Sequence, residues 1–351
     1  MSVPGISFND GHQVPWIAFG TGTALYQQDA TEAVKIALEN GFTHLDGAQM
    51  YNNETTLGAG IVASGKPRSE IFVTTKLTKL QSGQTAKTAL EDSLKKLGLQ
   101  QVDLYLIHSP SHHQGPGRLG QVWKEMEECQ SEGLTKSIGV SNFQPQHLKE
   151  ILEVGSISPA VNQIELHPYV WKSLQSVLDM HAKHGIVTSS YGGLSPLFRE
   201  KGGPLDPVVE KIRSRLETTR GSPVSDGQVL NKWMQQKKIL VVTTSSKPKR
   251  IREYLDTINV PDLTPEESDL IETTGSKLHK KFFVSQLRTI SSMIVVRLKL
   301  TLPSNFDLLV IESQWFRLNF TRGPHHYIVK SLRRKSPIVQ WNFFAATKNG
   351  V

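Results

Sequence analysis

The chain repeats one pattern eight times before residue 258: a short run rich in β-branched residues, followed by a longer segment with helical spacing of its apolar residues. This alternation indicates βα units and a parallel sheet. Eight such units close most economically as a (β/α)8 barrel, whose active sites lie at the carboxyl ends of the strands. We therefore predict an α/β barrel with strands at 16–20, 41–46, 71–76, 102–108, 136–141, 160–164, 186–190 and 238–243.

The helices are predicted at 29–40, 53–64, 84–97, 119–132, 145–154, 172–184, 204–218 and 248–257, with a further one near 223–236. An Asp-Gly turn between short alternating runs at 6–15 predicts a hairpin that plugs the barrel floor. Another helix begins at Thr264 with a capping-box arrangement and runs to about Leu278.

A dinucleotide-binding Rossmann fold is the rival α/β architecture. Residues 58–63 fit its glycine pattern, but they lie within a predicted helix rather than in a strand-to-helix turn. No acidic residue ends a second strand about 20 residues further on, as that fold requires. Residues 20–22, Gly-Thr-Gly, lack the third glycine and are better interpreted as a tight turn near a ligand. The barrel is therefore favoured.

Polar side chains stand at the carboxyl ends of three neighbouring predicted strands. Asp46, Lys76 and His108 close these runs, and Tyr51 follows in the loop after Asp46. Each alone is more often a structural residue, but four on adjacent strand ends favour a site. An ammonium near a phenol lowers the pKa of the phenol, and a carboxylate offsets the desolvation of a buried lysine. The set suits proton transfer from Tyr51 to a carbonyl oxygen, with Lys76 tuning Tyr51, Asp46 holding Lys76 and His108 orienting the substrate.

Three separated segments carry a resemblance to a known family. Residues 46–54, Lys76 and residues 106–110 keep both residue type and strand position, and they resemble the aldo-keto reductases over roughly four fifths of the chain, from the hairpin to about residue 283. The resemblance implies that Asp46, Tyr51, Lys76 and His108 are the catalytic residues, with Tyr51 as general acid. It also implies reduction of an aldehyde or activated ketone by hydride transfer from NADPH.

The same resemblance assigns the cofactor contacts. It implies that Ser141, Asn142 and Gln163 hold the nicotinamide carboxamide and that Tyr191 stacks on the nicotinamide ring. Without the catalytic set, ordinary turn chemistry would explain these polar residues equally well. The remaining contacts expected near the nicotinamide and pyrophosphate are Gly22, Thr23, Gly192, Leu194 and Ser195.

The end of the eighth strand opens a helix, a favourable place for a phosphate. Many relatives hold the adenosine 2′-phosphate there with a lysine, a serine and an arginine. In this chain Thr244 stands at the lysine position, with Ser245 and Arg250 at the other two. Arg250 can still pair bidentately with phosphate, so NADPH is favoured over NADH. Further contacts are expected from Ser246 and Glu253.

The substrate is less constrained by the sequence. The tryptophan that often forms a pocket wall after the first strand is absent, and the 243–246 pattern looks most like fungal reductases of α-keto amides and conjugated polyketones. Two alternatives stay open: an aldose or polyol reductase, and an NADPH-binding sensor subunit with little turnover. His112 and His113 are expected to be exposed turn residues, since no third metal ligand is evident.

The net charge of +8 is concentrated in residues 289–351, where nine Lys and Arg oppose two acids. The remaining 1–288 segment, the predicted reductase barrel, is therefore nearly neutral, which argues against a nucleic-acid binder. In 289–351 neither a sustained helical period nor clean strand alternation is evident. Two interpretations remain: a basic extension that binds anionic partners, and sequence outside the folded enzyme, such as a translated intron.

No apolar run approaches the roughly 20 residues of a membrane helix, and no secretory signal is visible at the N-terminus. We expect a cytoplasmic protein without membrane or nucleic-acid partners, acting on a small-molecule carbonyl substrate as a monomer or weak dimer. Cys129 is the only cysteine, so an internal disulfide is excluded and a structural thiol is expected.

Overall fold

The computed structural model describes residues 4–283 and three short segments, 308–312, 317–322 and 327–332. The chain divides into two compact units, residues 1–293 and 294–351. None of the helices in the described part has the length and hydropathy needed to cross a membrane.

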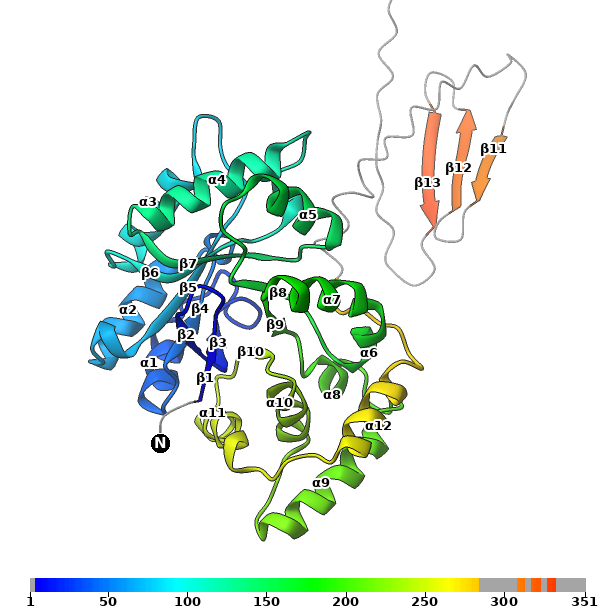
Figure 1. The fold of residues 1–351 in the computed structure, drawn as a ribbon. Coiled ribbons are helices and arrows are strands. Elements are labelled where there is room, and N and C mark those ends of the chain that lie inside the picture. The colour runs from blue at the N-terminus through cyan, green and yellow to red at the C-terminus, as the bar shows by residue number, and fades with distance from the viewer. Residues whose placement is uncertain (1–3, 284–307, 313–316, 323–326, 333–351) are drawn as a thin grey trace, which may run out of the picture. The chain divides into compact units, whose positions relative to one another are not determined.

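The first unit is a closed barrel of eight parallel strands, and the predicted fold is confirmed (Figure 1). Around the barrel the order is β10-β3-β4-β5-β6-β7-β8-β9, and closure comes from β10, which pairs with both β3 and β9. The strands are β3 (Ile17–Gly20), β4 (His44–Asp46), β5 (Phe72–Leu77), β6 (Val102–Ile107), β7 (Thr135–Ser141), β8 (Val161–Glu165), β9 (Val187–Tyr191) and β10 (Leu240–Thr243).

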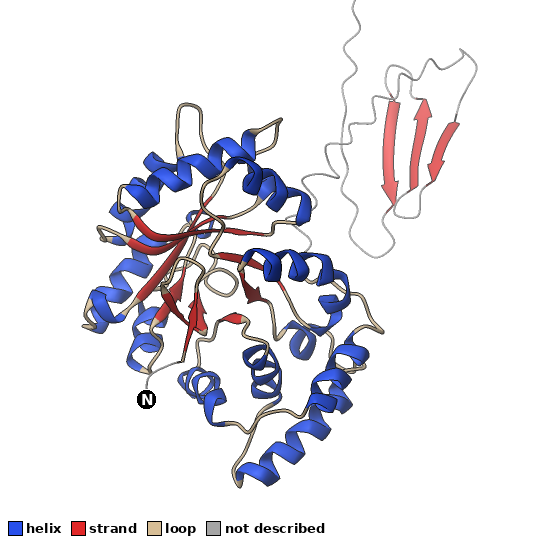
Figure 2. Cartoon of the chain, viewed as in Figure 1, coloured by secondary structure: helices blue, strands red, loops and turns tan. Residues whose placement is uncertain are grey.

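Helices surround the strands (Figure 2), and their buried apolar residues form one core together with those of the strands. The main helices are α1 (Thr31–Glu39), α2 (Glu54–Ser64), α3 (Ala86–Leu97), α4 (Arg118–Ser131), α5 (Pro145–Val154), α7 (Gln175–His184), α9 (Asp206–Arg220), α10 (Asp226–Gln236), α11 (Pro248–Leu255) and α12 (Pro265–Gly275). Two short ones, α6 (Pro168–Trp171) and α8 (Ser195–Arg199), were not predicted separately. The predicted capping box of Thr264 is present at α12.

The glycines that resembled a dinucleotide fingerprint lie inside α2, as predicted. A Cβ atom on Gly60 would stand 2.6 Å from Cβ of Val34 in α1. Gly60 therefore permits close packing of two helices and is not part of a phosphate loop.

The N-terminal hairpin, β1 (Gly5–Ser7) and β2 (Gln13–Pro15), covers one end of the barrel. Its Phe8 and Val14 are buried in an apolar cluster with side chains from the barrel interior, including Leu104 and Leu106. This end carries the starts of the strands, because the ring of Phe8 meets that of Phe72, the first residue of β5, at 6.3 Å. The opposite, carboxyl end is left open for a site.

Two expectations about single residues have different outcomes. Cys129 is fully buried, and burial raises the pKa of its thiol to about 12, so it stays protonated as a structural residue. The expectation that His113 is exposed is wrong: it belongs to the loop that follows β6, and it is only 3% exposed. His112 is half-buried.

The second unit contains strands that the sequence analysis did not predict. They form an antiparallel sheet in the order β11-β12-β13, with bounds Leu308–Glu312, Arg317–Arg322 and Tyr327–Leu332. In Arg317–Arg322 apolar and polar residues do alternate, but the run is short and flanked by basic residues. The other residues of 289–351, on which the two interpretations of the tail also depend, lie outside the described residues.

Candidate active site

The four predicted catalytic residues come together at the carboxyl end of the barrel. Asp46 is the last residue of β4, and Tyr51 ends the single turn Gln49–Tyr51 that follows it. Lys76 is the penultimate residue of β5, which extends one residue beyond its predicted end. His108 directly follows β6.

Lys76 is the centre of a buried hydrogen-bond network. Its Nζ donates to Asp46 Oδ1 at 2.5 Å, to the carbonyl oxygen of Gly47 at 2.8 Å and to Tyr51 Oη at 3.4 Å. Burial would lower the pKa of Lys76, but the charge of Asp46 and the hydrogen bonds to Asp46 and Tyr51 outweigh burial and raise it. The ammonium therefore stays charged. Asp46 Oδ2 in turn accepts a hydrogen bond from Gln163 Nε2 at 2.8 Å, so both carboxylate oxygens are satisfied.

The pKa of Tyr51 lies above the ordinary tyrosine value, so its hydroxyl is protonated at neutral pH. Burial raises the pKa of its hydroxyl, and the Lys76 ammonium lowers it by a smaller amount. Lys76 thus lowers the pKa of Tyr51, as predicted. The net shift is nevertheless upward, so the prediction that the pKa of Tyr51 is below its ordinary value is wrong. Desolvation of the buried phenol outweighs the effect of the single neighbouring charge.

His108 is an uncharged imidazole beside Tyr51. Burial holds its pKa well below the ordinary histidine value, and the nearby Lys76 lowers the pKa further. The two rings meet edge to face at 5.5 Å between centroids. Because His108 is neutral, it can donate or accept one hydrogen bond without adding charge to the site.

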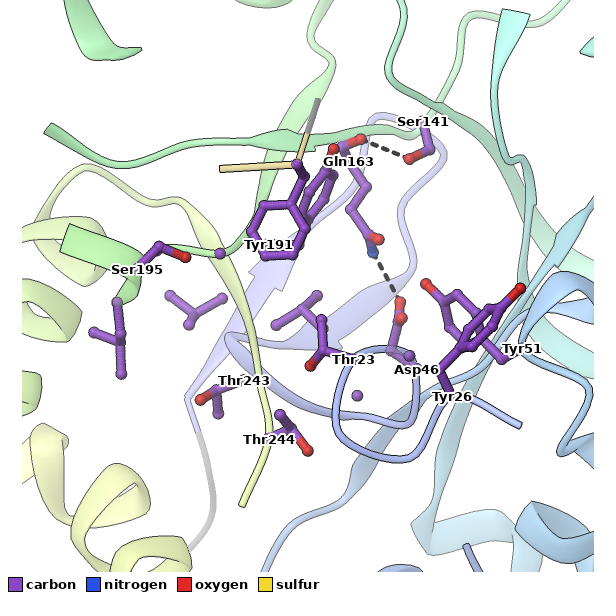
Figure 3. Close-up of a pocket in the computed structure, with 18 of the residues that line it drawn as sticks. Thr23, Tyr26, Asp46, Tyr51, Ser141, Gln163, Tyr191, Ser195, Thr243 and Thr244 are labelled. Atoms are coloured by element: carbon purple, nitrogen blue, oxygen red, sulfur yellow. Dashed lines mark hydrogen bonds between the residues drawn. The ribbon is translucent and has the colours of Figure 1, made fainter. Parts of the chain in front are cut away.

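A cavity of about 540 Å³ opens above these residues (Figure 3). It extends from Tyr51 and His108 past Tyr191 to Thr243 and Thr244 at the end of β10. An elongated space at the carboxyl end of a barrel suits a long ligand rather than a small metabolite alone. The predicted cofactor residues in its lining are Gly22, Thr23, Ser141, Gln163, Tyr191, Gly192, Leu194, Ser195 and Thr244.

The residues predicted to hold the carboxamide are bonded to one another. Ser141 Oγ donates to the carbonyl oxygen of Gln163 at 2.7 Å, as Figure 3 shows, and Asn142 Nδ2 donates to that of His108 at 3.0 Å. The hydroxyl of Tyr191 donates to Asn142 Oδ1 at 2.7 Å. These bonds fix the ring of Tyr191 as a wall of the cavity, and Asn142 itself lies behind that wall.

The predicted phosphate-binding residues lie at the outer end of the cavity. Ser246 and Arg250 are exposed, and the Arg250 guanidinium lies 5.3 Å from the ring centroid of Phe198. Ser245 Oγ accepts a hydrogen bond from the backbone N–H of Lys247 at 3.1 Å. Glu253 points away, since it accepts a hydrogen bond from Ser225 Oγ at 2.5 Å.

Several cavity residues were not predicted. Tyr26 has its ring 6.4 Å from that of Tyr51, and Phe283 meets Tyr191 edge to face at 5.3 Å. Phe283 could have been predicted, because it is an aromatic residue at the point where the resemblance to the family ends. The other unpredicted lining residues include Met50, Ser111, His112, Phe198, Arg199, Thr243 and Tyr254. Within the described residues, no three His, Cys, Asp or Glu side chains cluster in a way that could hold a metal ion.

Gly22 makes room for Tyr51. A Cβ atom at position 22 would stand 2.7 Å from Cζ of Tyr51. We expect Gly22→Ala to displace the phenol and lower kcat about 10- to 100-fold, because misplacement of a reacting group by about 1 Å has that cost. The matched control is Gly227→Ala in α10, where the nearest atom would be 3.6 Å away. Steady-state kinetics of both variants check this, and an unchanged kcat in the Gly22 variant would contradict it.

The fold and the strand-end site together define a (β/α)8-barrel enzyme. Residues 16–275 match the Aldo/keto reductase family, and the chain belongs to that family. It is 36% identical over 287 residues to an NAD/NADP-dependent indole-3-acetaldehyde reductase of Schizosaccharomyces pombe, covering 79% of this chain and 97% of that protein. It is 34% identical over 284 residues to an NADPH-dependent alpha-keto amide reductase of Saccharomyces cerevisiae, covering 77% and 90%.

Solved structures give the same result. An aldo-keto reductase of Bombyx mori in complex with NADP is 30% identical, with a TM-score of 0.68 over 78% of this chain and 93% of that one. An aldo/keto reductase from Brucella melitensis is 32% identical, with a TM-score of 0.67 over 78% and 100%. The resemblance inferred from the sequence is confirmed.

Proposed function

We propose that this protein reduces an aldehyde or an activated ketone to the alcohol, using NADPH. The observation that carries the proposal is the position of Tyr51 in the cavity, with its hydroxyl bonded to Lys76 Nζ and its ring beside that of His108. A bound nicotinamide would supply the hydride. Tyr51 would donate its proton to the carbonyl oxygen, and the charge left on the phenolate would be stabilised by Lys76. His108 would orient that oxygen through a hydrogen bond.

The residues present fit a nicotinamide cofactor. Tyr191 offers an aromatic face in the cavity, and its hydrogen bond to Asn142 holds this ring in place. Gln163 lines the same cavity, where it is hydrogen-bonded to Asp46. Gly192 has a positive φ of 71°, and a neighbouring Ser195 hydroxyl lines the cavity. Ser195 begins a short helix and Pro248 begins α11, and the start of a helix favours the negative charge of a phosphate.

Arg250 is the residue we propose to distinguish NADPH from NADH. It is exposed at the start of α11, near Phe198, and its guanidinium can pair bidentately with a 2′-phosphate. We expect Arg250→Ala to raise the Michaelis constant for NADPH by about tenfold or more, with little change for NADH. Steady-state kinetics with both cofactors measure this.

The control for Arg250 is Arg252→Ala on the same helix. The guanidinium of Arg252 donates to Asn40 Oδ1 at 2.6 Å, so its loss should affect neither cofactor. Equal effects of the Arg250 change on NADPH and NADH would contradict the assignment. The replacement of the family's lysine by Thr244 makes Arg250 more important here.

An activated ketone such as an α-keto amide is the substrate class we favour. The similarity to an alpha-keto amide reductase supports this choice, and so do the polar and aromatic groups that line the cavity, among them Tyr26, Ser111 and His112. The test is NADPH oxidation followed by absorbance with a panel of aldehydes, α-keto amides, diketones and sugars. Fastest turnover with sugars would favour a polyol reductase. Tight NADPH binding without turnover of any compound would overturn the proposed reaction.

A further inference from the structure

A second cavity, of about 340 Å³, adjoins the first. It is formed by the loop that follows β6, the first turns of α5, the end of β8 and the segment near Lys281. Ser111, Tyr191 and Phe283 line both cavities. The two cavities therefore adjoin at these three residues, next to the space that a substrate bound at Tyr51 would occupy.

Two polar atoms of the second cavity are buried without a partner. His113 is 3% exposed, and its Nε2 has no hydrogen-bond partner among the described residues. Glu150 Oε1, on α5, is likewise buried and unpaired within that part of the chain. Leaving a buried polar atom without a hydrogen bond is unfavourable, so such atoms in a cavity wall point to a ligand or to ordered water.

A third group supplies a hydrogen-bond donor. The backbone N–H of Gln144 donates to His147 Nδ1 at 3.1 Å. In the neutral ring the proton therefore lies on Nε2 of His147, which is free to donate. The cavity thus offers an acceptor at Glu150, a donor at His147, and at His113 an atom that serves either way.

The charges of the lining disfavour an anionic ligand. Glu150 and Glu165 carry two negative charges against the single positive charge of Lys281. The histidines add none: burial lowers the pKa of His113 to about 4 and also lowers that of His147. Glu165 is already bonded to the backbone N–H of Phe282, which leaves Glu150 as the available carboxylate. A neutral group with an N–H fits this wall best.

We propose that the second cavity is a subsite for the distal end of the carbonyl substrate, and that it takes a neutral carboxamide. Its N–H would donate to Glu150, and its carbonyl oxygen would accept from His147 or His113. This inference rests on the proposed reduction, because the subsite matters only if a carbonyl is bound at Tyr51. It makes the enzyme selective for the far end of the substrate as well as for the reacting carbonyl.

The test uses aldehydes that differ only at the far end: the primary amide, the methyl ester and the free acid of adipic semialdehyde. Propanal, too short to reach the second cavity, reports the basal reaction. We expect kcat/KM for the amide to exceed that for the ester about tenfold, mainly through KM, as one satisfied hydrogen-bonding pair allows. The free acid should be the poorest of the three.

Two variants should abolish the preference. His113→Leu and Glu150→Met should bring the amide-to-ester ratio close to one while propanal turnover stays unchanged, which also shows that the variants fold. His184→Leu, a change of the same kind outside both cavity linings, should keep the ratio. Equal kcat/KM for all three tails, a preference for the acid, or an unchanged ratio in both variants would overturn the subsite. Failure of the wild type to reduce propanal or any of the three would instead overturn the proposed function.

Discussion

Tyr51→Phe is expected to lower kcat about 10²- to 10⁴-fold, the usual contribution of a positioned general acid. The change removes only the hydroxyl that accepts from Lys76 Nζ, and leaves the ring in its edge-to-face contact with His108. The Lys76 ammonium keeps its bonds to Asp46 and Gly47, so the site stays folded. NADPH binding should therefore remain within a few-fold of wild type by fluorescence titration while turnover is lost.

Tyr26→Phe is the matched control for this prediction. The ring of Tyr26 lies in the same cavity, 6.4 Å from that of Tyr51, while Lys76 Nζ donates its hydrogen bonds to Asp46, Gly47 and Tyr51. Its loss should change kcat by no more than a few-fold. If both tyrosine variants lost activity equally, or if Tyr51→Phe kept it, Tyr51 would not be the proton donor.

The barrel and the catalytic set could be predicted because both are recorded locally in the sequence. The strands are short buried runs flanked by helical segments, and their ends were predicted to within about three residues. Asp46, Lys76 and His108 each sit at the end of such a run. Since parallel strands bring their carboxyl ends to one side, residue type and position alone place these groups together.

The remaining cavity walls depend on packing between distant segments, which the sequence does not record. Phe283 lies beside Tyr191 only because the chain after α12 returns across the barrel, where the backbone N–H of Phe282 donates to Glu165. His113 was predicted to be exposed from its loop context, yet the structure buries it. The pKa of Tyr51 could not be predicted for the same reason, since its direction depends on depth of burial.

Lys76→Met is expected to lose both turnover and stability. The side chain of Lys76 is fully buried, and its removal leaves the Asp46 carboxylate, itself 2% exposed, with a hydrogen bond from Gln163 and no positive charge beside it. Breaking a buried ion pair on one side costs about 3–5 kcal/mol. Urea denaturation should therefore show a lower free energy of unfolding. Turnover should fall about 100-fold or more, because the phenolate formed when Tyr51 gives up its proton loses its stabilising charge.

The double variant Asp46→Asn/Lys76→Met separates these two effects. The asparagine side chain would carry no charge, so most of the lost stability should return, while turnover should stay low because the ammonium beside Tyr51 is still missing. A double variant that regained activity together with stability would mean that Lys76 serves only to balance Asp46. Stability restored without activity is the result expected if the buried pair exists to hold a positive charge 3.4 Å from the phenol oxygen.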